Sequence, residues 1–424
     1  MTSPSNTKTR PDAKSYSSEP AGVILGKPGL LTMLMVLILA AWFGQMILVI
    51  VTGLVLTAAG LANLWSHFSL VGVNCQRFIS EQRLFPGEHT DLRLRLVNRK
   101  PLPLPWIQVD EEIPANLTPD APTRPGNRVG YDFLSNATSL LWYTGINWRC
   151  RLHASKRGYY PLGPIVVTSG DIFGFYPRTF TQPSNDRIIV YPRLFPLHYL
   201  GLPSLHPIGE TKAEQRIFED PTRTISVRNY TPHDSLKYIH WKATARHQKL
   251  QVKVFEPTTT LKTAIFLAVD SFHDNSGAIS EEDFELGIST VASIANYIVE
   301  QRSPVGLFVN SRLADSGQPV RIPPSSSVNR LVNMLEALAK ITSIPTASFD
   351  DFLQNERRGL PWGTTTIIVT AKPSDSVAVL LTGLREGKHK PLVFQIGEQG
   401  IVEHTVPWYR VRNPDDLIEF KERP

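Results

Sequence analysis

The stretch of this sequence with the densest chemically capable side chains is residues 227–257. Its rings are Tyr230, Tyr238 and Trp241, its imidazoles are His233, His240 and His247, and its cations are Arg228, Lys237, Lys242, Arg246, Lys249 and Lys253. Rings beside cations can stack on bases and neutralise phosphates, or they can supply the Trp and Arg anchors of a protein interface. The whole chain carries a formal charge of only +6, which is small for a dedicated nucleic-acid binder. The sequence therefore favours a structural and partner-binding role over nucleic-acid binding.

Local patterns predict a turn, a helix and a strand within this segment. Thr-Pro-His-Asp at residues 231–234 is typical of a turn, with Pro presetting φ and Asp234 placed to cap the next element. A short helix is predicted next, because apolar or half-apolar residues recur at i, i+3, i+4 and i+7. These residues are Leu236, Ile239, His240 and Ala243. Alternation over residues 250–255 then predicts a strand.

The expected helix has two kinds of side chain with opposite preferences. Trp241 and Leu236 are large and apolar, and we expect both to face inward against the rest of the domain. Lys242 and Arg246 lie four residues apart on another face, and we expect both to face solvent. In this arrangement Trp241 would stabilise the fold, and Lys242 and Arg246 would contact a partner protein.

The same segment resembles the signature of the bacterial domain of unknown function 58, Arg-x-Tyr-x-Pro-x-Asp … Ile-His-Trp-Lys-x-x-Ala-Arg … Leu-x-Val-Lys. The matching positions are Arg228, Tyr230, Pro232, Asp234, Ile239, His240, Trp241, Lys242, Ala245, Arg246, Leu250, Val252 and Lys253. The family usually has Gly where this chain has His233, a residue type that tolerates positive φ better than most. The signature residues that we take as partner-binding candidates are Arg228, Tyr230, Asp234, His240, Trp241, Lys242 and Arg246.

A second stretch, residues 157–193, is similar to the family pattern Arg-Gly-x-Tyr-x-Leu-Gly-Pro … Asp-x-Phe-Gly … Tyr-Pro, with Asp171 and Phe173 in the middle part. The resemblance implies a membrane-anchored protein with a von Willebrand factor A-like C-terminal domain. Members of the family commonly accompany a MoxR-type AAA+ ATPase. Such an ATPase, with other envelope proteins, is therefore the implied partner.

Residues 28–76 contain no Asp, Glu, Lys or Arg. The apolar part of this stretch is longer than the roughly 20 residues of one straight membrane pass, which predicts a transmembrane hairpin of two helices over residues 29–66. Gly44-Gln45 is the expected turn. Basic residues lie on both sides of the hairpin and its loop is uncharged, so both ends are expected in the cytoplasm. We therefore expect a multi-pass protein of the bacterial cytoplasmic (inner) membrane, with residues 1–28 as a disordered cytoplasmic tail and cytoplasmic soluble domains.

Two further domains are expected after the hairpin. Short alternating strands and turn signals over residues 72–193 predict a small β-sandwich. Residues 210–424 alternate apolar strands with helical segments, which predicts an α/β domain with a mostly parallel sheet, and the family resemblance makes it von Willebrand factor A-like. Its expected helices are residues 281–302, 328–341 and 374–386, and its expected strands are residues 263–270, 305–309, 364–370, 392–396 and 406–411.

Asp270 ends the first expected strand of this α/β domain, where ligands bind in open sheets. In von Willebrand A domains the position opens an Asp-x-Ser-x-Ser metal motif. Here the run is Asp270-Ser271-Phe272-His273-Asp274, and the ring at Phe272 cannot ligate a hard cation. We therefore expect a degenerate motif at Asp270, Ser271 and Asp274 that holds no metal, and we expect no cofactor.

The sequence nominates no catalytic constellation. Gly-x-Ser-x-Gly, a phosphate-binding Gly-Lys-Ser/Thr loop and Cys-x-x-Cys are all missing, and His233, His240 and His247 are too far apart to be close ligands on one helical face. Whether Cys75 and Cys150 pair is left open. The expected function is a non-enzymatic, membrane-anchored protein-binding or assembly factor of the cell envelope, with no nucleic acid or small-molecule substrate. The alternatives are a cation-dependent ligand-binding or adhesion module and a hydrolase with an unrecognised site.

Overall fold

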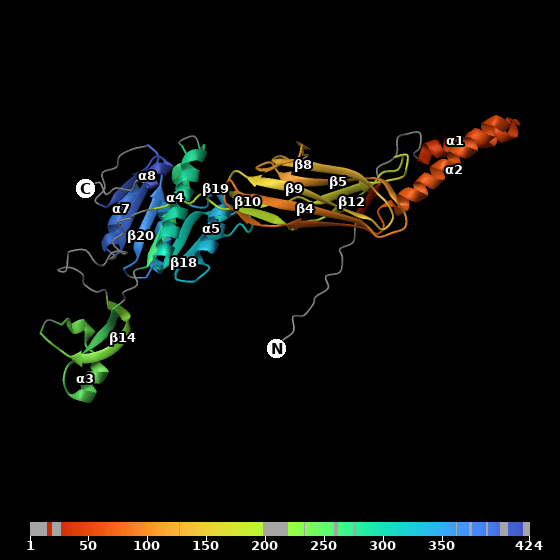
Figure 1. Ribbon diagram of the computed structural model, residues 1–424. Coiled ribbons are helices and arrows are strands. Elements are labelled where there is room, and N and C mark those ends of the chain that lie inside the picture. The colour runs from red at the N-terminus through yellow and green to blue at the C-terminus, as the bar shows by residue number, and fades with distance from the viewer. Residues whose placement is uncertain are drawn as a thin grey trace. The chain divides into compact units, whose positions relative to one another are not determined.

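The computed structural model describes residues 15–18, 27–126, 128–197, 219–232, 234–257, 262–274, 277–361, 363–372, 375–386, 389–398 and 406–418. The chain divides into two compact units, Met1–Val190 and Tyr191–Pro424. Figure 1 shows the helices and strands of each unit and labels many of them.

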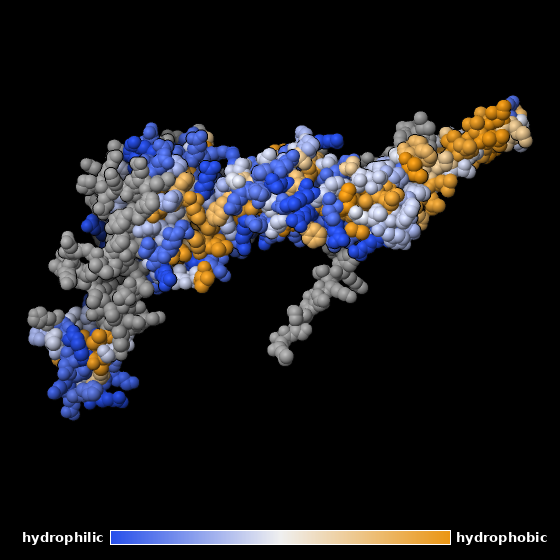
Figure 2. Space-filling model, viewed as in Figure 1, coloured by the Kyte–Doolittle hydropathy of each residue, from blue (hydrophilic) through white to orange (hydrophobic). Residues whose placement is uncertain are grey.

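The first unit begins with two apolar helices, α1 (Lys27–Trp42) and α2 (Met46–Ser69), which form the hydrophobic tip in Figure 2. Gly44 separates them with a left-handed φ of 67°, and α1 ends in a Schellman motif because Gln45 N–H donates to the Ala40 carbonyl and Gly44 N–H to that of Ala41. The structure therefore has the turn at Gly44-Gln45, as predicted.

Only one of these helices reaches the thickness of a bilayer. The 24 residues of α2 extend about 36 Å, more than the hydrocarbon core of about 30 Å, whereas the 16 residues of α1 extend about 24 Å. Among the described residues, α2 alone is long and apolar enough to cross a membrane. The prediction of two spanning helices over residues 29–66 is thus supported for one of the two.

The rest of the first unit is built from strands. They are β1 (Ser15–Ser18), β2 (Val73–Ile79), β3 (Arg83–Leu84), β4 (His89–Asn98), β5 (Leu104–Pro114), β6 (Leu117–Pro119), β7 (Thr123–Pro125), β8 (Tyr131–Leu140), β9 (Gly145–Ala154), β10 (Gly158–Pro161), β11 (Ile165–Ser169), β12 (Arg178–Gln182) and β13 (Arg187–Val190). Two antiparallel sheets have the orders β1-β12-β11-β5-β8-β7 and β2-β4-β9-β6, and a small mixed sheet has the order β10-β13-β3.

The alternation of the sequence decides which face of each strand is buried. In β4, Leu94 and Leu96 are buried while Arg93 and Arg95 are exposed. The two leucines share one hydrophobic cluster with Val109 of β5 and other residues of the larger sheet. The two antiparallel sheets are therefore packed face to face, with the core between them.

A buried ion pair joins the two sheets inside this core. Arg77 on β2 donates through Nε to Glu111 on β5 at 2.7 Å, and the side chains of both residues are almost completely buried. The same guanidinium donates to the Ser184 hydroxyl at 2.7 Å and to the Gly163 carbonyl at 3.0 Å. Burial raises the pKa of Glu111, and the charge of Arg77 opposes that rise. One guanidinium thus ties β2, β5 and two loops together.

The second unit contains an open α/β sheet. Its strands are β16 (Thr263–Leu267), β17 (Val305–Leu313), β18 (Pro319–Ser325), β19 (Ile341–Pro345), β20 (Thr365–Thr370), β21 (Lys390–Ile396) and β22 (Trp408–Val411), and its helices are α4 (Glu281–Glu300), α5 (Arg330–Lys340), α6 (Phe349–Glu356), α7 (Asp375–Glu386) and α8 (Pro414–Ile418). The main strand order is β18-β17-β16-β20-β21-β22, with all pairs parallel except that of β17 and β18. Every residue of β16 and β20 is buried, as expected of central strands in a parallel sheet.

Helices cover this sheet on both faces (Figure 1). Phe266 of β16 packs with Phe352 of α6 and Leu381 of α7 in one cluster, whereas α4 packs with α5 and contacts the strands from the other side. The sheet, the covering helices and the parallel strand order agree with the predicted α/β fold class. The narrower von Willebrand factor A-like assignment stays a prediction.

The Arg77–Glu111 pair generates the first testable prediction. Arg77→Met should lower the free energy of unfolding by about 3–5 kcal/mol, because it leaves the Glu111 carboxylate buried without its cation. The double change Arg77→Met, Glu111→Leu should recover most of that loss, since neither charge is then buried. Urea unfolding of the detergent-solubilised chain measures both effects.

Arg95→Met is the matched control, because Arg95 is an exposed arginine on the neighbouring strand β4. It should change the free energy of unfolding by about 0.5 kcal/mol or less. A single Arg77→Met variant as stable as this control would show that the buried pair does not hold the two sheets together.

Candidate functional site

The predicted signature forms a small structural piece of its own, residues 219–257, here called the signature hairpin. Strands β14 (Glu219–Asn229) and β15 (Gln251–Pro257) pair antiparallel as a two-stranded sheet. Between them lie a 3₁₀ turn, η1 (Leu236–Tyr238), and the short helix α3 (Trp241–His247). In Figure 1 the hairpin is the green element labelled β14 and α3.

An ion pair closes the turn after β14. The two guanidinium nitrogens of Arg228 donate to the two carboxylate oxygens of Asp234 at 2.7 and 2.5 Å. Thr231 adds its backbone N–H at 2.8 Å and its hydroxyl at 2.7 Å to Oδ2 of the same carboxylate. Arg228, and after it Thr231, hold the pKa of Asp234 well below its usual range. Asp234 therefore caps the turn rather than the helix that the sequence predicted after it.

His240 starts helix α3 and also fixes it to the strand. Its Nδ1 accepts a hydrogen bond from the Ala243 N–H at 3.1 Å, so the side chain serves as the N-cap. Its backbone N–H donates to the Gln251 carbonyl at 2.8 Å, and the preceding Ile239 forms a bridge with Val252. Ile239 and Val252 are both buried.

The single helix predicted through Leu236, Ile239, His240 and Ala243 is wrong. Ile239 has extended backbone angles, because it pairs with Val252, and this pairing breaks the helix into η1 and α3. Leu236 and Ala243 consequently belong to different elements and do not share one helical face.

The expectation that Trp241 and Leu236 face inward is also wrong. Trp241 is 70% exposed and Leu236 is 65% exposed. Two strands and a seven-residue helix offer too little surface to cover them. Lys242 and Arg246 are exposed, as predicted, and Figure 2 shows hydrophobic atoms beside strongly hydrophilic ones on this part of the chain. We call Leu236, Trp241, Lys242 and Arg246 the Trp241 surface.

The remaining signature residues have structural surroundings. Tyr230 is partly buried, and its backbone N–H donates to the Leu250 carbonyl across the hairpin at 2.9 Å. Gln248 ends α3 in the left-handed region with φ of 52°. Thr244 accepts the Gln251 N–H through its hydroxyl at 3.0 Å, a contact that the sequence did not reveal. The structure thus joins all these positions into one hairpin, with His233 outside the described residues.

The predicted metal motif lies at the carboxyl end of β16, as its sequence position implied. Asp270 accepts the side-chain amide of Asn310 through Oδ1 at 2.9 Å and the Phe349 N–H through Oδ2 at 2.8 Å. Ser271 donates to the Ala268 carbonyl at 2.7 Å and accepts the Ala371 N–H at 2.9 Å. These bonds connect the ends of β16, β17 and β20 with the start of α6. Asp270 and Ser271 therefore hold the segments at this edge of the sheet together through hydrogen bonds.

The other two positions of the motif make contacts elsewhere. Phe272 is buried and packs edge-on against Phe284, with ring centroids 5.6 Å apart. Gly287 lies so close that an added Cβ would be 2.6 Å from the Phe272 ring. Asp274 is exposed and accepts the Ala278 N–H at 2.8 Å, which closes the turn after it.

Histidines and cysteines do not gather at either location. In the part of the chain that the structure describes, no three His, Cys, Asp or Glu side chains lie close enough to hold a metal ion. His240 caps α3, and His247 is exposed at its other end. Cys75 and Cys150 do not form a disulfide with each other, and burial raises the pKa of Cys150.

Comparison with known proteins bears on the signature hairpin directly. Residues 226–360 match the model of a family described as "Protein of unknown function DUF58". "Uncharacterized protein YeaD" of Bacillus subtilis (strain 168) is 23% identical over 249 residues, which is 58% of this chain and 58% of that one. This chain therefore spans little more than half of that relative.

Solved structures are much less similar. The alkylpurine DNA glycosylase AlkC of Pseudomonas fluorescens, bound to DNA with an abasic site analog, is 17% identical, with 28% of this chain and 30% of that chain covered and a TM-score of 0.18. The sporulation control protein Spo0M of Bacillus subtilis is 10% identical, with 28% and 49% covered and a TM-score of 0.17. Similarities this weak carry no argument about fold or function.

The Arg228–Asp234 pair predicts how the signature hairpin responds to pH. The folded hairpin keeps Asp234 ionised below its ordinary pKa of about 3.9, so the unfolded hairpin binds the proton first. Stability from the pair is therefore present above about pH 4 and is lost as the pH falls below it. Hydrogen-exchange protection of residues 228–247, corrected for intrinsic rates, should fall in that window.

Asp234→Asn provides the control, because an amide does not titrate there and pairs poorly with Arg228. The variant should be less protected at pH 7 and should lose the acid-dependent step. Equal protection of variant and wild type at pH 7 would mean that the ion pair does not hold the hairpin.

The hydrogen bonds of Asp270 generate a third prediction. Asp270→Ala should lower the free energy of unfolding by about 1–3 kcal/mol, because the Phe349 N–H and the Asn310 amide lose their acceptor. Glu398→Ala removes an exposed carboxylate of the same unit and should cost about 0.5 kcal/mol or less. Magnesium or manganese should leave the melting temperature of the wild type unchanged. A saturable rise with either metal, abolished by Asp270→Ala, would instead establish a cation site.

Proposed function

Because this chain belongs to the DUF58 family through residues 226–360, we propose that it is a membrane-anchored protein-binding factor of the cell envelope whose signature hairpin docks a MoxR-type AAA+ ATPase. It works in assembly or maturation and is not itself an enzyme. The observation that carries this proposal is the Trp241 surface. A tryptophan that is 70% exposed, on a short helix that also exposes two cations, has the composition of an interface rather than of a core.

Burial of Trp241 is the main source of binding energy in this proposal. Large aromatic side chains bury about 150–250 Å² and dominate interface energetics. Leu236 adds a second apolar side chain that is already exposed before binding. A partner that covers both therefore gains the hydrophobic free energy that the thin hairpin leaves unused.

Rigidity of the hairpin supports the same role. Arg228 and Asp234 close the turn before η1, and His240 fixes the start of α3 to β15. A surface that is already ordered loses less conformational entropy on binding. The docking side chains are thus presented from a fixed frame although the hairpin has only a small core.

The charges on this surface specify the complementary partner. Lys242 and Arg246 are exposed, and Lys237 lies 4.9 Å from the centre of the Tyr238 ring. A partner with an acidic rim around an apolar pocket matches this pattern, and such complementarity speeds association and sets specificity.

The proposed topology agrees with a partner that uses ATP. Both ends of the α1–α2 hairpin face the cytoplasm in this proposal, because basic residues flank it on both sides and its turn is uncharged. The soluble units then lie where an AAA+ ATPase finds its nucleotide. Two membrane passes belong to the proposal, and α2 is the helix of spanning length that supports it.

The cation-dependent alternative has less support. Both carboxylate oxygens of Asp270 accept protein hydrogen bonds, and Phe272 is packed in the core where a ligand oxygen is needed. A role in protein binding needs neither group.

The test is binding of the full chain in nanodiscs to the purified MoxR-type ATPase of the same genome. Trp241→Ala should weaken binding roughly thirtyfold, the equivalent of about 2 kcal/mol, while melting stays unchanged because the ring is exposed. Lys242→Glu, Arg246→Glu should slow association and change its salt dependence.

Two variants of the first unit serve as matched controls. Trp142→Ala removes another exposed tryptophan, and Arg93→Glu, Arg95→Glu reverses two exposed charges on β4. Both should bind as wild type does. Normal binding by both variants of the Trp241 surface would place the docking site elsewhere, whereas no binding by the wild type would remove this ATPase as the partner.

A further inference from the structure

A loop of the first unit lies beside the second half of α2. It comprises residues 171–176, Asp-Ile-Phe-Gly-Phe-Tyr, and is here called the Asp171 loop. The Ser66 hydroxyl of α2 donates to the Tyr176 carbonyl, which fixes the loop to the helix. The Lys100 ammonium donates to the Phe68 carbonyl at 2.8 Å, so the connection between β4 and β5 also holds the end of α2.

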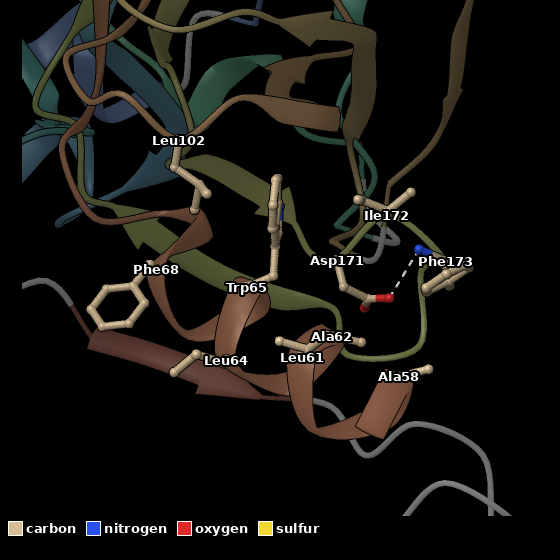
Figure 3. Close-up of a pocket in the computed structure, with 10 residues that line it drawn as sticks. All are labelled: Ala58, Leu61, Ala62, Leu64, Trp65, Phe68, Leu102, Asp171, Ile172 and Phe173. Carbon is tan, nitrogen blue, oxygen red and sulfur yellow. Dashed lines mark hydrogen bonds between the residues drawn. The ribbon is translucent and has the colours of Figure 1, made fainter. Parts of the chain in front are cut away.

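A pocket of about 460 Å³ opens between the loop and the helix (Figure 3). Apart from Asp171, its lining is apolar, and the view shows Ile172 and Phe173 across from the α2 side chains. The α2 residues that line it are Ala58, Leu61, Ala62, Leu64, Trp65 and Phe68. An apolar pocket of this size is suited to hydrocarbon.

The geometry of α2 sets the depth of this pocket in a membrane. Ala58 lies eleven residues before the last helical residue, Ser69, which corresponds to about 16 Å along the axis. A hydrocarbon core of about 30 Å takes up about 20 residues of α2, so it reaches from Met46 to about Trp65. When α2 spans the bilayer in this way, the α2 residues of the pocket from Ala58 to Leu64 lie at the level of the acyl chains, and Trp65 and Phe68 lie at its boundary.

The tip of the loop carries side chains that suit this level. Ile172 is 59% exposed, Phe173 is 62% exposed and Phe175 is 37% exposed. The rings of Phe173 and Phe175 stack with centroids 5.4 Å apart. A cluster of large apolar side chains at a loop tip is unfavourable in water and favourable among acyl chains.

The backbone of the loop is also prepared for an apolar surrounding. The buried carboxylate of Asp171 accepts the Phe173 N–H at 2.9 Å and the Tyr176 N–H at 2.7 Å. The Asp171 carbonyl accepts the Gly174 N–H at 3.2 Å and the indole N–H of Trp106 at 3.0 Å. Gly174 makes the tight turn possible with φ of 73°. These bonds satisfy the N–H groups of Phe173, Gly174 and Tyr176, which lowers the cost of placing the loop among acyl chains.

A second group of exposed aromatic side chains lies close to the pocket. Leu141, Trp142 and Tyr143, between β8 and β9, are all largely exposed. The Asn98 side-chain amide donates to the carbonyls of both Leu102 and Leu141 at 2.9 Å, which joins this connection to the pocket. Trp and Tyr beside the end of a spanning helix are typical of the headgroup level.

We infer that the Asp171 loop is inserted into the membrane, with Ile172, Phe173 and Phe175 among the lipid acyl chains and an acyl chain in the pocket between the loop and α2. Trp142 and Tyr143 lie at the headgroups. The inference rests on the proposed anchoring by α2 and goes beyond it, since a helical anchor alone leaves the β-sheets free in water. The partner of this surface is bilayer phospholipid.

Spin labels on the full chain test the inference. A cysteine-free background, Cys75→Ala, Cys150→Ser, receives one labelled cysteine at Phe173, and a second variant carries it at Ile172. The chain is reconstituted in nanodiscs of phosphatidylethanolamine and phosphatidylglycerol. Collision with oxygen, which concentrates in acyl chains, is compared with collision with a water-soluble nickel complex.

Two further labels calibrate the measurement. Leu54 is exposed in the middle of α2, and Val129 is fully exposed before β8, at the opposite end of that strand from Leu140. The labels at Phe173 and Ile172 should show an oxygen-to-nickel collision ratio several-fold above that at Val129 and close to that at Leu54. Because both loop side chains are largely exposed, labelling removes no core packing.

The outcomes separate this inference from the anchoring on which it rests. Loop labels that match Val129, while Leu54 reports lipid, would overturn the insertion of the loop and leave the anchor intact. If Leu54 also reports water, α2 does not span the bilayer and both statements fail. A lipid signal at Leu54 and at both loop positions supports both.

Discussion

Carboxylates that accept backbone N–H groups hold the irregular parts of this chain in place. Asp171 accepts two N–H groups of its loop, Asp234 accepts one N–H with a hydroxyl and a guanidinium, and Asp270 accepts the first N–H of α6. Hydrogen bonds to an ionised acceptor are roughly twice as strong as neutral ones. Each of these segments therefore keeps a defined shape although its backbone is irregular.

Regular elements were predictable wherever one periodicity dominated the sequence. Alternation over β4 and the nearly all-apolar run of β16 both predicted strands, and the structure has strands there. Strand β18 was missed because it pairs at the sheet edge and contains prolines, which depress the strand signal. Helix α6 was missed because it has only eight residues, too few for a clear apolar period.

The signature hairpin shows where sequence patterns mislead. Leu236, Ile239, His240 and Ala243 have helical spacing, but Ile239 pairs with Val252 of strand β15, outside the window in which the helical spacing is read. Tertiary pairing of this kind overrides a local period. The prediction that Trp241 faces inward was wrong because burial depends on the amount of neighbouring surface and not on the residue type alone.

The same reasoning connects Trp241 with Phe173, although they belong to different units. Each is a large aromatic side chain left exposed on a small element, and each element is stiffened by an aspartate that gathers hydrogen bonds. A stiff element does not collapse onto its own apolar side chains, so the exposed area stays available to another surface at little entropic cost. The surroundings decide which surface that is. Lys242 and Arg246, exposed on the same helix as Trp241, match a charged protein rim, whereas the apolar face of α2 beside Phe173 matches acyl chains.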